Sequence, residues 1–407
     1  RETSMEVINE DTSRCKLKPG DIVGPYVVEK KIGTGYFCAV YQCRANDKSV
    51  AFKIYGTGFK KYFRNEVQLL RKINDSGNDY VVNLYDVHAH IDKRTAVIYP
   101  CIITELRGDT VFKLVDYCKE QCGHGLPMPM VRAVARDMLA GLAHLHSIGI
   151  IHGDIKPDNL LLNRVVSDDL TAADIHIKII DFGSSTQTDE IFTTSVGTIG
   201  YTAPEIVVEH EFGTAADIWS AFTVIFELIA SDLLFDVFFE HNIDYGDVNE
   251  TVVGAFDDET VYTKCIGCCD DNTETGRAKY ASCSCQLCDT CGAHDNCVTS
   301  VASDSGDSAA HTYAQNYCYL LLVAKVIGYP PAEFTALARD YYNKKGRLIS
   351  NPDVEPCGIT TLLMNNYDLD ADECARIDAF LSLGLKYTPD ERITAADALI
   401  HDFCAEI

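Results

Sequence analysis

The stretch H-G-D-I-K-P-D-N, residues 152–159, decides how the rest of this sequence is interpreted. It follows an apolar pair, Ile150-Ile151, and places an acid, a lysine and an asparagine in one short loop. Asp181-Phe182-Gly183 lies 27 positions beyond Asp154, and Ala203-Pro204-Glu205 lies 22 positions beyond Asp181. One tripeptide of this kind means little, but the ordered set at these spacings leaves chance a very small share. The sequence therefore predicts a catalytic site on which distant segments converge.

A second set of residues, nearer the N-terminus, suits phosphate binding. Gly33-Thr34-Gly35 lies between two strand patterns, where glycines let the backbone approach a phosphate closely. Cys38 stands where the usual motif has a third glycine. Lys53 lies inside an apolar strand, where an unpaired charge is expensive unless phosphate oxygens and a carboxylate meet it. Glu66, on the next predicted helix, is the natural carboxylate. Taken alone, this set could equally be a turn followed by a surface lysine.

Together these motifs resemble the signature of eukaryotic protein kinases, and the resemblance implies catalytic roles. Asp154 would accept or orient the proton of a substrate hydroxyl, and Thr198 would bond both Asp154 and Lys156. Lys156 would neutralise the phosphoryl group in transfer. Asn159 and Asp181 would bind Mg²⁺ through oxygen, which this hard cation prefers. Lys156 and Thr198 are also the residue types that serine/threonine kinases use at these places.

The same resemblance assigns ATP to a cleft between two lobes. Lys53 would hold the α- and β-phosphates while Glu66 fixes the position of Lys53. Thr104 would close the back of the adenine pocket, and Glu105 and Leu106 would offer backbone groups to adenine. The other residues assigned to the nucleotide are Gly33, Gly35 and Val40.

Hydrophobic patterning divides the chain into a strand-rich part followed by a helical part. Alternating apolar residues predict strands over 26–32, 39–43 and 49–55, with one helix near 60–73. Helical spacing dominates from Met128 onward. The expected fold class is α+β: a bilobal kinase fold with a small β-rich N-lobe and a larger, mainly helical C-lobe. The expected parts are an N-terminal extension at 1–20, an N-lobe at 21–105 and a C-lobe at 106–407, which contains an acidic, cysteine-rich insertion at 236–309.

Within the kinase superfamily the sequence most resembles the SR-protein kinases of the CMGC group. The loop Gly33 to Phe37 carries this resemblance, as do Asp217 to Phe235 and Tyr342 to Leu348. It implies phosphorylation of serines in basic, Arg-Ser-rich proteins held in an acidic groove of the large lobe, and hence regulation of mRNA splicing. Thr202 stands where the wider group has an arginine, so the substrate preference stays open. Another CMGC-type substrate class, or a pseudokinase scaffold, is the alternative.

The composition bears on partners and location. The net charge of −25 and pI near 4.7 disfavour direct nucleic-acid binding and favour Lys- or Arg-rich partners, although acidity alone could serve only solubility. The first fifteen residues lack the apolar run of a secretory signal. The apolar stretch Ala215 to Phe235 contains three acids, which predicts a buried helix rather than a membrane span. We therefore expect a cytoplasmic or nuclear monomer without membrane association.

Eight of the 18 cysteines lie between Cys265 and Cys297. Cys265/Cys268 and Cys288/Cys291 form two C-x2-C pairs with the spacing of zinc ligands. Thiolates of this kind favour Zn²⁺ at a closed structural site. An insertion whose cysteines bind no metal is the equal alternative.

The catalytic loop has Gly153 where kinases usually have an arginine. That arginine is the main receptor for a phosphate on the activation segment, so the sequence predicts activity without segment phosphorylation. Treating the purified protein with a phosphatase, and then measuring phosphoryl transfer, should leave most of the activity. Complete loss of activity would contradict the prediction.

Overall fold

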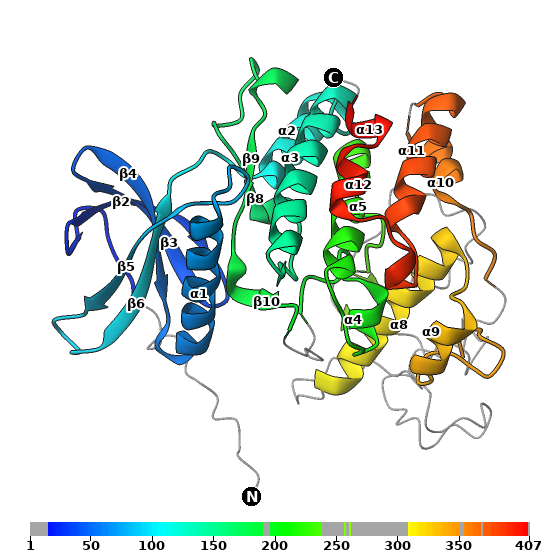
Figure 1. The fold of residues 1–407 in the computed structure, drawn as a ribbon, viewed down its shortest axis with the longest axis horizontal. Helices are drawn as coiled ribbons and strands as arrows, with labels where there is room; N and C mark the ends of the chain where they lie inside the picture. The colour runs from blue at the N-terminus through cyan, green and yellow to red at the C-terminus, as the bar shows by residue number, and fades with distance from the viewer. Residues whose placement is uncertain are drawn as a thin grey trace, which may run out of the picture.

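The computed structural model describes residues 15–189, 196–237, 256–257, 260–261, 308–349, 354–367 and 369–405. A strand-rich lobe occupies one end of the molecule and a mainly helical lobe the other (Figure 1). The predicted α+β bilobal fold is therefore confirmed.

The small lobe is built on one six-stranded antiparallel sheet with the order β1-β2-β3-β4-β6-β5. Side chains alternate along β4, so Phe52 and Ile54 join a core on one face of the sheet while Lys53 and Tyr55 point to the other face. The strands are β1 (Ile22–Val23), β2 (Tyr26–Thr34), β3 (Cys38–Ala45), β4 (Lys48–Tyr55), β5 (Leu84–Ile91) and β6 (Ile98–Glu105).

Helix α1 (Lys60–Ser76) covers the sheet face to which Lys53 points. Leu69, Leu70 and Ile73 recur at helical spacing and are buried, and Glu66 is buried on the same side. The helix ends at Gly77, whose positive φ of 67° suits glycine and whose N–H donates to Asn74 O. The predicted helix thus forms, and its charged residue is turned inward by the packing of its apolar neighbours.

The large lobe is helical around a core shared by α3 and α5. Its main helices are α2 (Val111–Cys122), α3 (Met128–Ser147), α4 (Pro204–Val207), α5 (Ala215–Ala230), α8 (Ser308–Ile327), α9 (Ala332–Leu337), α10 (Ile359–Asn366), α11 (Ala371–Gly384), α12 (Ala395–Leu399) and α13 (Asp402–Ala405). Short antiparallel pairs form between β7 (Ile150–Ile151) and β10 (Thr186–Gln187), and between β8 (Leu160–Leu162) and β9 (Ile177–Ile179).

The buried helix expected over Ala215 to Phe235 is shorter than predicted. It ends at Ala230, because Ser231 takes a left-handed conformation with φ of 57° while its N–H donates to Glu227 O. Leu234 and Phe235 remain buried, but in the segment after the helix. Among the described residues, none of the helices has the length and apolar character needed to cross a membrane.

The predicted insertion lies largely outside the described residues. The exceptions are Asp236 and Val237, the paired strands β11 (Phe256–Asp257) and β12 (Thr260–Val261), and the start of α8 at Ser308. The candidate zinc ligands Cys265, Cys268, Cys288 and Cys291 all lie outside the described residues. Among the described residues, the free thiols include Cys15, Cys38, Cys43, Cys101, Cys118, Cys122, Cys318, Cys374 and Cys404.

A buried ion pair joins the segment before α5 to the C-terminal part of the large lobe. Arg392 Nη1 and Nη2 each donate to one Glu205 carboxylate oxygen, both at 2.7 Å. Arg392 Nη1 also donates to Ala215 O at the start of α5, and both charged side chains are buried. In this bidentate geometry, the guanidinium and the carboxylate form two parallel charge-assisted hydrogen bonds, which replace hydrogen bonds to water.

Changing Arg392 to methionine should lower the free energy of unfolding by about 3–5 kcal/mol, because Glu205 is left buried without its cation. Urea unfolding measures this loss. Lys113→Met is the matched control, since it removes an exposed pair with Asp109 and should cost about 1 kcal/mol or less. Equal losses in the two variants would show that the buried pair is not structural.

Candidate active site

Three charged side chains meet at the boundary between the lobes. Lys53 Nζ lies 2.8 Å from Glu66 Oε2 and 2.8 Å from Asp181 Oδ1, so strand β4, helix α1 and the D-F-G turn are joined by one ammonium. Tyr55, two residues further along the same face of β4, donates its hydroxyl to Glu66. The prediction that Glu66 pairs with Lys53 is confirmed.

The pKa values in this cluster follow from burial and from the neighbouring charges. Burial acts to lower the pKa of Lys53, but Asp181 and Glu66 outweigh it and raise that pKa above its ordinary value. Burial acts to raise the pKa of Asp181, but Lys53 outweighs it and lowers the pKa to about 2. Lys53 and Asp181 are therefore both charged near neutral pH.

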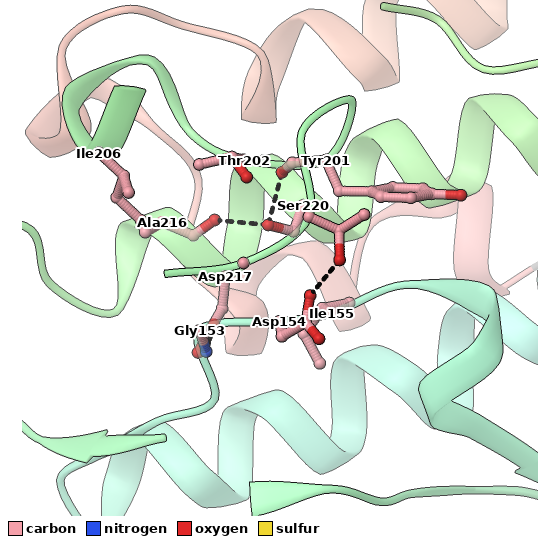
Figure 2. A pocket seen from close by; sticks show the side chains of 11 residues that line it. Gly153, Asp154, Ile155, Tyr201, Thr202, Ile206, Ala216, Asp217 and Ser220 are labelled. Atoms are coloured by element: carbon pink, nitrogen blue, oxygen red, sulfur yellow. Dashed lines mark hydrogen bonds between the residues drawn. The ribbon is translucent and has the colours of Figure 1, made fainter. Parts of the chain in front are cut away.

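The catalytic loop forms a second cluster in the large lobe. Asp154 Oδ1 accepts from the Thr198 hydroxyl at 2.8 Å, and Asp154 Oδ2 lies 2.9 Å from Lys156 Nζ. Lys156 also donates to Thr198 at 2.7 Å, so the three side chains form a closed triangle, as predicted. Asp154 lines a pocket together with Thr198 and Tyr201. Figure 2 shows Asp154 facing the segment that carries Tyr201 and Thr202.

A buried carboxylate at the start of α5 holds the backbone of the catalytic loop. Asp217 accepts from the N–H groups of His152 and Gly153, at 2.9 and 2.8 Å, and its Oδ2 lies 2.9 Å from His146 Nε2. Burial opposes ionisation of Asp217, but these hydrogen bonds lower its pKa below the ordinary value. Figure 2 shows Asp217 pointing toward the loop from the helix side.

Two side-chain oxygens near these clusters suit Mg²⁺. Asn159 donates its Nδ2 to Asp154 O and Asp154 Oδ2, which leaves Asn159 Oδ1 without a donor among the described residues. Asp181 uses Oδ1 for Lys53 and Gly183 N–H, which leaves Oδ2. Oxygen donors of this type fit Mg²⁺. No group of three or more His, Cys, Asp or Glu side chains in the described ranges is placed to hold a metal, so nucleotide phosphates would have to supply further ligands.

Comparison with known proteins agrees with this arrangement. A family model for the protein kinase domain matches residues 26–404. The chain belongs to the protein kinase family. A solved kinase domain, PF14_0431, shares the fold with a TM-score of 0.64 at 18% identity, over 96% of this chain and 99% of that one.

Curated relatives narrow the class of this kinase. It is 23% identical to the serine/threonine-protein kinase SRPK of Physarum polycephalum, over 96% of this chain and 88% of that protein. It is 29% identical to the serine/threonine-protein kinase AFC2 of Arabidopsis thaliana, over 58% of each chain. It is 32% identical to a probable dual specificity protein kinase, a YAK1 homolog of Encephalitozoon cuniculi, over 52% of this chain and 49% of that protein. The chain is a protein serine/threonine kinase, which uses ATP and acts on proteins.

The residues predicted to contact adenine lie on β6 or directly after it. Thr104 lies on this strand between Ala51 of β4 and Leu84 of β5. The N–H of Glu105 already donates to Asn83 O at 3.1 Å, so its carbonyl is the backbone group that it could offer to adenine, alongside Leu106. Of the two backbone groups of Glu105, only the carbonyl oxygen therefore remains a candidate for the predicted contact with adenine.

The glycines predicted to approach the phosphates lie at the turn between β2 and β3. Gly33 pairs with Val40 across these strands, and Val40 pairs in turn with Lys53 on β4. Gly35 N–H donates to Cys38 O at 2.9 Å. Cys38 is buried and has no positive φ, so the third glycine is not needed to close this turn.

Some contacts of the site were missed in the sequence. Glu105 Oε1 accepts from Lys178 Nζ at 2.6 Å, which ties the end of β6 to strand β9 of the large lobe. Asn65 Nδ2 donates to Ser185 O at 2.7 Å. The Tyr55 contact with Glu66 could have been found, because Tyr55 is two residues from Lys53 on a strand and shares its face. The other two pairs join residues far apart in sequence, and no local pattern indicates them.

Changing Asp154 to alanine should lower phosphoryl transfer by roughly 10²–10⁴-fold, because the hydroxyl of the substrate loses its proton acceptor. Transfer of radiolabel from ATP to a basic protein substrate measures this. Asp116→Ala, at an exposed position of α2, is the control and should leave transfer unchanged. A wild-type protein that binds ATP but transfers no label would instead be a pseudokinase.

Proposed function

We propose that this kinase transfers the γ-phosphoryl group of Mg-ATP to serines of basic, Arg-Ser-rich proteins. Support comes from the cluster of carboxylates beside Asp154, from the net charge of −25 and from the similarity to SRPK over most of the chain. The cluster of carboxylates carries the proposal, because it is the feature that would select basic substrates.

The proposed chemistry uses the two side-chain clusters together. Lys53, held by Glu66, would bind phosphate oxygens of ATP at the small-lobe side. Asp154 would accept a hydrogen bond from the substrate serine hydroxyl and take its proton, while Lys156 would stabilise charge on the phosphoryl group. Asn159 and Asp181 would hold Mg²⁺, which supplies positive charge against the phosphates. Positioning and charge neutralisation are what phosphoryl transfer mainly requires.

The cluster consists of Asp158, Glu227 and Asp232, and Asp232 is already paired with Lys119 at 2.8 Å. Asp158 lies on the catalytic loop, and Glu227 of α5 is bonded to the hydroxyl of Tyr201 at 2.7 Å. Burial, with the charges of Asp158 and Asp232, raises the pKa of Glu227 to about 7. A guanidinium placed among these groups would relieve their repulsion and form charge-assisted hydrogen bonds. Arginines of a substrate would therefore be stabilised close to the phosphoacceptor serine.

A second candidate is a kinase of the dual-specificity type, for which Ser-Pro peptides are the test substrate. Relatives at similar identity include kinases named as dual specificity, the YAK1 homolog and lkh1 of Schizosaccharomyces pombe. Thr202, where the wider group has arginine, offers its carbonyl oxygen to the Tyr319 hydroxyl at 2.6 Å. The end of the activation segment is thus anchored in the large lobe by a backbone contact, without a basic side chain at this position.

A peptide array that contrasts Arg-Ser repeats with Ser-Pro peptides should show preferential phosphorylation of the Arg-Ser repeats. Asp158→Asn should raise the KM for an Arg-Ser peptide by about tenfold, since one charge-assisted contact is lost. Its KM for a Ser-Pro peptide should change little.

The control for this test is Glu333→Gln at an exposed position of α9, which removes one negative charge far from the catalytic loop. It should leave both KM values unchanged. Preference for Ser-Pro peptides in the wild type would favour the second substrate class.

A further inference from the structure

In the start of the activation segment, residues 181–189, uncharged groups attach Ser185, Thr186 and Gln187 to the catalytic loop and the strand before it. Ser185 is buried, and its hydroxyl donates to His152 O at 2.7 Å. Thr186 and Gln187 pair with Ile151 and Ile150 as strands β10 and β7. The catalytic loop and the segment start are therefore attached to each other by a side-chain hydrogen bond and a short strand ladder.

The same segment start is attached to helix α1 of the small lobe. Asn65 Nδ2 donates to Ser185 O at 2.7 Å, and Lys72 Nζ donates to the Gln187 side chain at 2.9 Å. Ser185 thus has two partners: its hydroxyl donates to the catalytic loop, and its carbonyl oxygen accepts from Asn65 of helix α1. Asn65 immediately precedes Glu66, so this contact fixes the helix right beside the residue that holds Lys53.

The catalytic loop lacks the arginine that would hold the segment through a bound phosphate. Gly153 replaces the loop arginine, and it adopts a positive φ of 80° in which a residue with a side chain would be strained. A Cβ at this position would come within 3.2 Å of Ser184 O, so the segment start packs closely against the glycine. The structure leaves no room here for a side chain without a shift of the segment.

We propose that Asn65 and Ser185 are positioning residues that keep helix α1 and the segment start in their productive places without a phosphate. This inference rests on the proposed kinase function, since the effect is read out as phosphoryl transfer. When the Asn65–Ser185 contact is lost, helix α1 can move away from the large lobe, Glu66 leaves Lys53, and Lys53 loses one of the two carboxylates that fix its position. The hydrogen bonds thereby set the fraction of molecules in which the charged cluster is assembled.

The test compares two pairs of variants in phosphatase-treated protein. Asn65→Leu should lower kcat/KM for ATP about tenfold, because the carbonyl of Ser185 is left without its donor. Gln68→Leu is the matched control: it lies on the same helix at an exposed position with no hydrogen bond among the described residues. Asn65→Gln, which keeps the amide donor, should recover much of the loss.

The second pair removes one hydroxyl from neighbouring serines. Ser185→Ala should lower kcat/KM because the bond to His152 O is lost, whereas Ser184→Ala should not, since its hydroxyl makes no hydrogen bond among the described residues. In the double variant Asn65→Leu/Ser185→Ala, the fold-loss in kcat/KM should not exceed the product of the two single losses. It should be smaller than that product if both side chains position the same element. Equal kcat/KM in Asn65→Leu and Gln68→Leu, or loss of wild-type activity on dephosphorylation, would overturn the inference.

Amide hydrogen exchange gives a readout that does not depend on catalysis. Residues 60–76 and 181–189 should exchange faster in Asn65→Leu than in Gln68→Leu, while the rest of the large lobe stays unchanged. Should the wild type transfer no phosphate to any substrate, the proposed function fails, and this measurement still decides whether Asn65 positions the helix. Unchanged exchange in both segments would refute the positioning role.

Discussion

One buried ammonium, that of Lys53, governs how the two lobes of this kinase meet. It lies on strand β4, whose other face packs Val50, Phe52 and Ile54 into an apolar core. Carboxylates from α1 and from the D-F-G turn stabilise its charge there. Two carboxylates share a single cation, and burial together with the charge of Asp181 raises the pKa of Glu66 to about 7, so the cluster carries excess negative charge when Glu66 is ionised. A bound Mg²⁺ would meet that excess, which is why the same geometry that stabilises the fold also suits a nucleotide–metal complex.

The second support of the site is helix α5, which is buried along its length. Asp217 in its first turn holds the backbone of the catalytic loop, and Trp219 donates to the Tyr319 hydroxyl, which in turn bonds Thr202 O. Arg392 bonds the carbonyl of Ala215 at the start of this helix as well as Glu205. The catalytic loop and the end of the activation segment are thus positioned from one rigid element, because its apolar faces leave it little freedom to move.

The sequence predicted those parts of the site whose chemistry repeats at fixed spacings. Lys53 with Glu66, and Asp154 with Lys156 and Thr198, were found, since a buried charge needs a partner and few candidates exist. The Asn65–Ser185 and Glu105–Lys178 contacts were not found, because neutral or surface-type residues pair over long separations without a pattern. The end of α5 was misplaced because apolar residues continue past Ser231, where only the backbone conformation stops the helix.

Charged and uncharged restraints have different consequences for control of the kinase. A phosphate bound by an arginine can be removed by a phosphatase, so an activation segment held in that way can be switched. The bonds from Asn65 and Ser185 are fixed by the sequence, and with Gly153 at its usual position the catalytic loop itself supplies no arginine to a phosphate. If the segment start is held in this way, the assembled charged cluster is the resting state of the molecule. Control would then have to act on the encounter with substrate, where the carboxylates Asp158, Glu227 and Asp232 respond to the charge of the incoming chain.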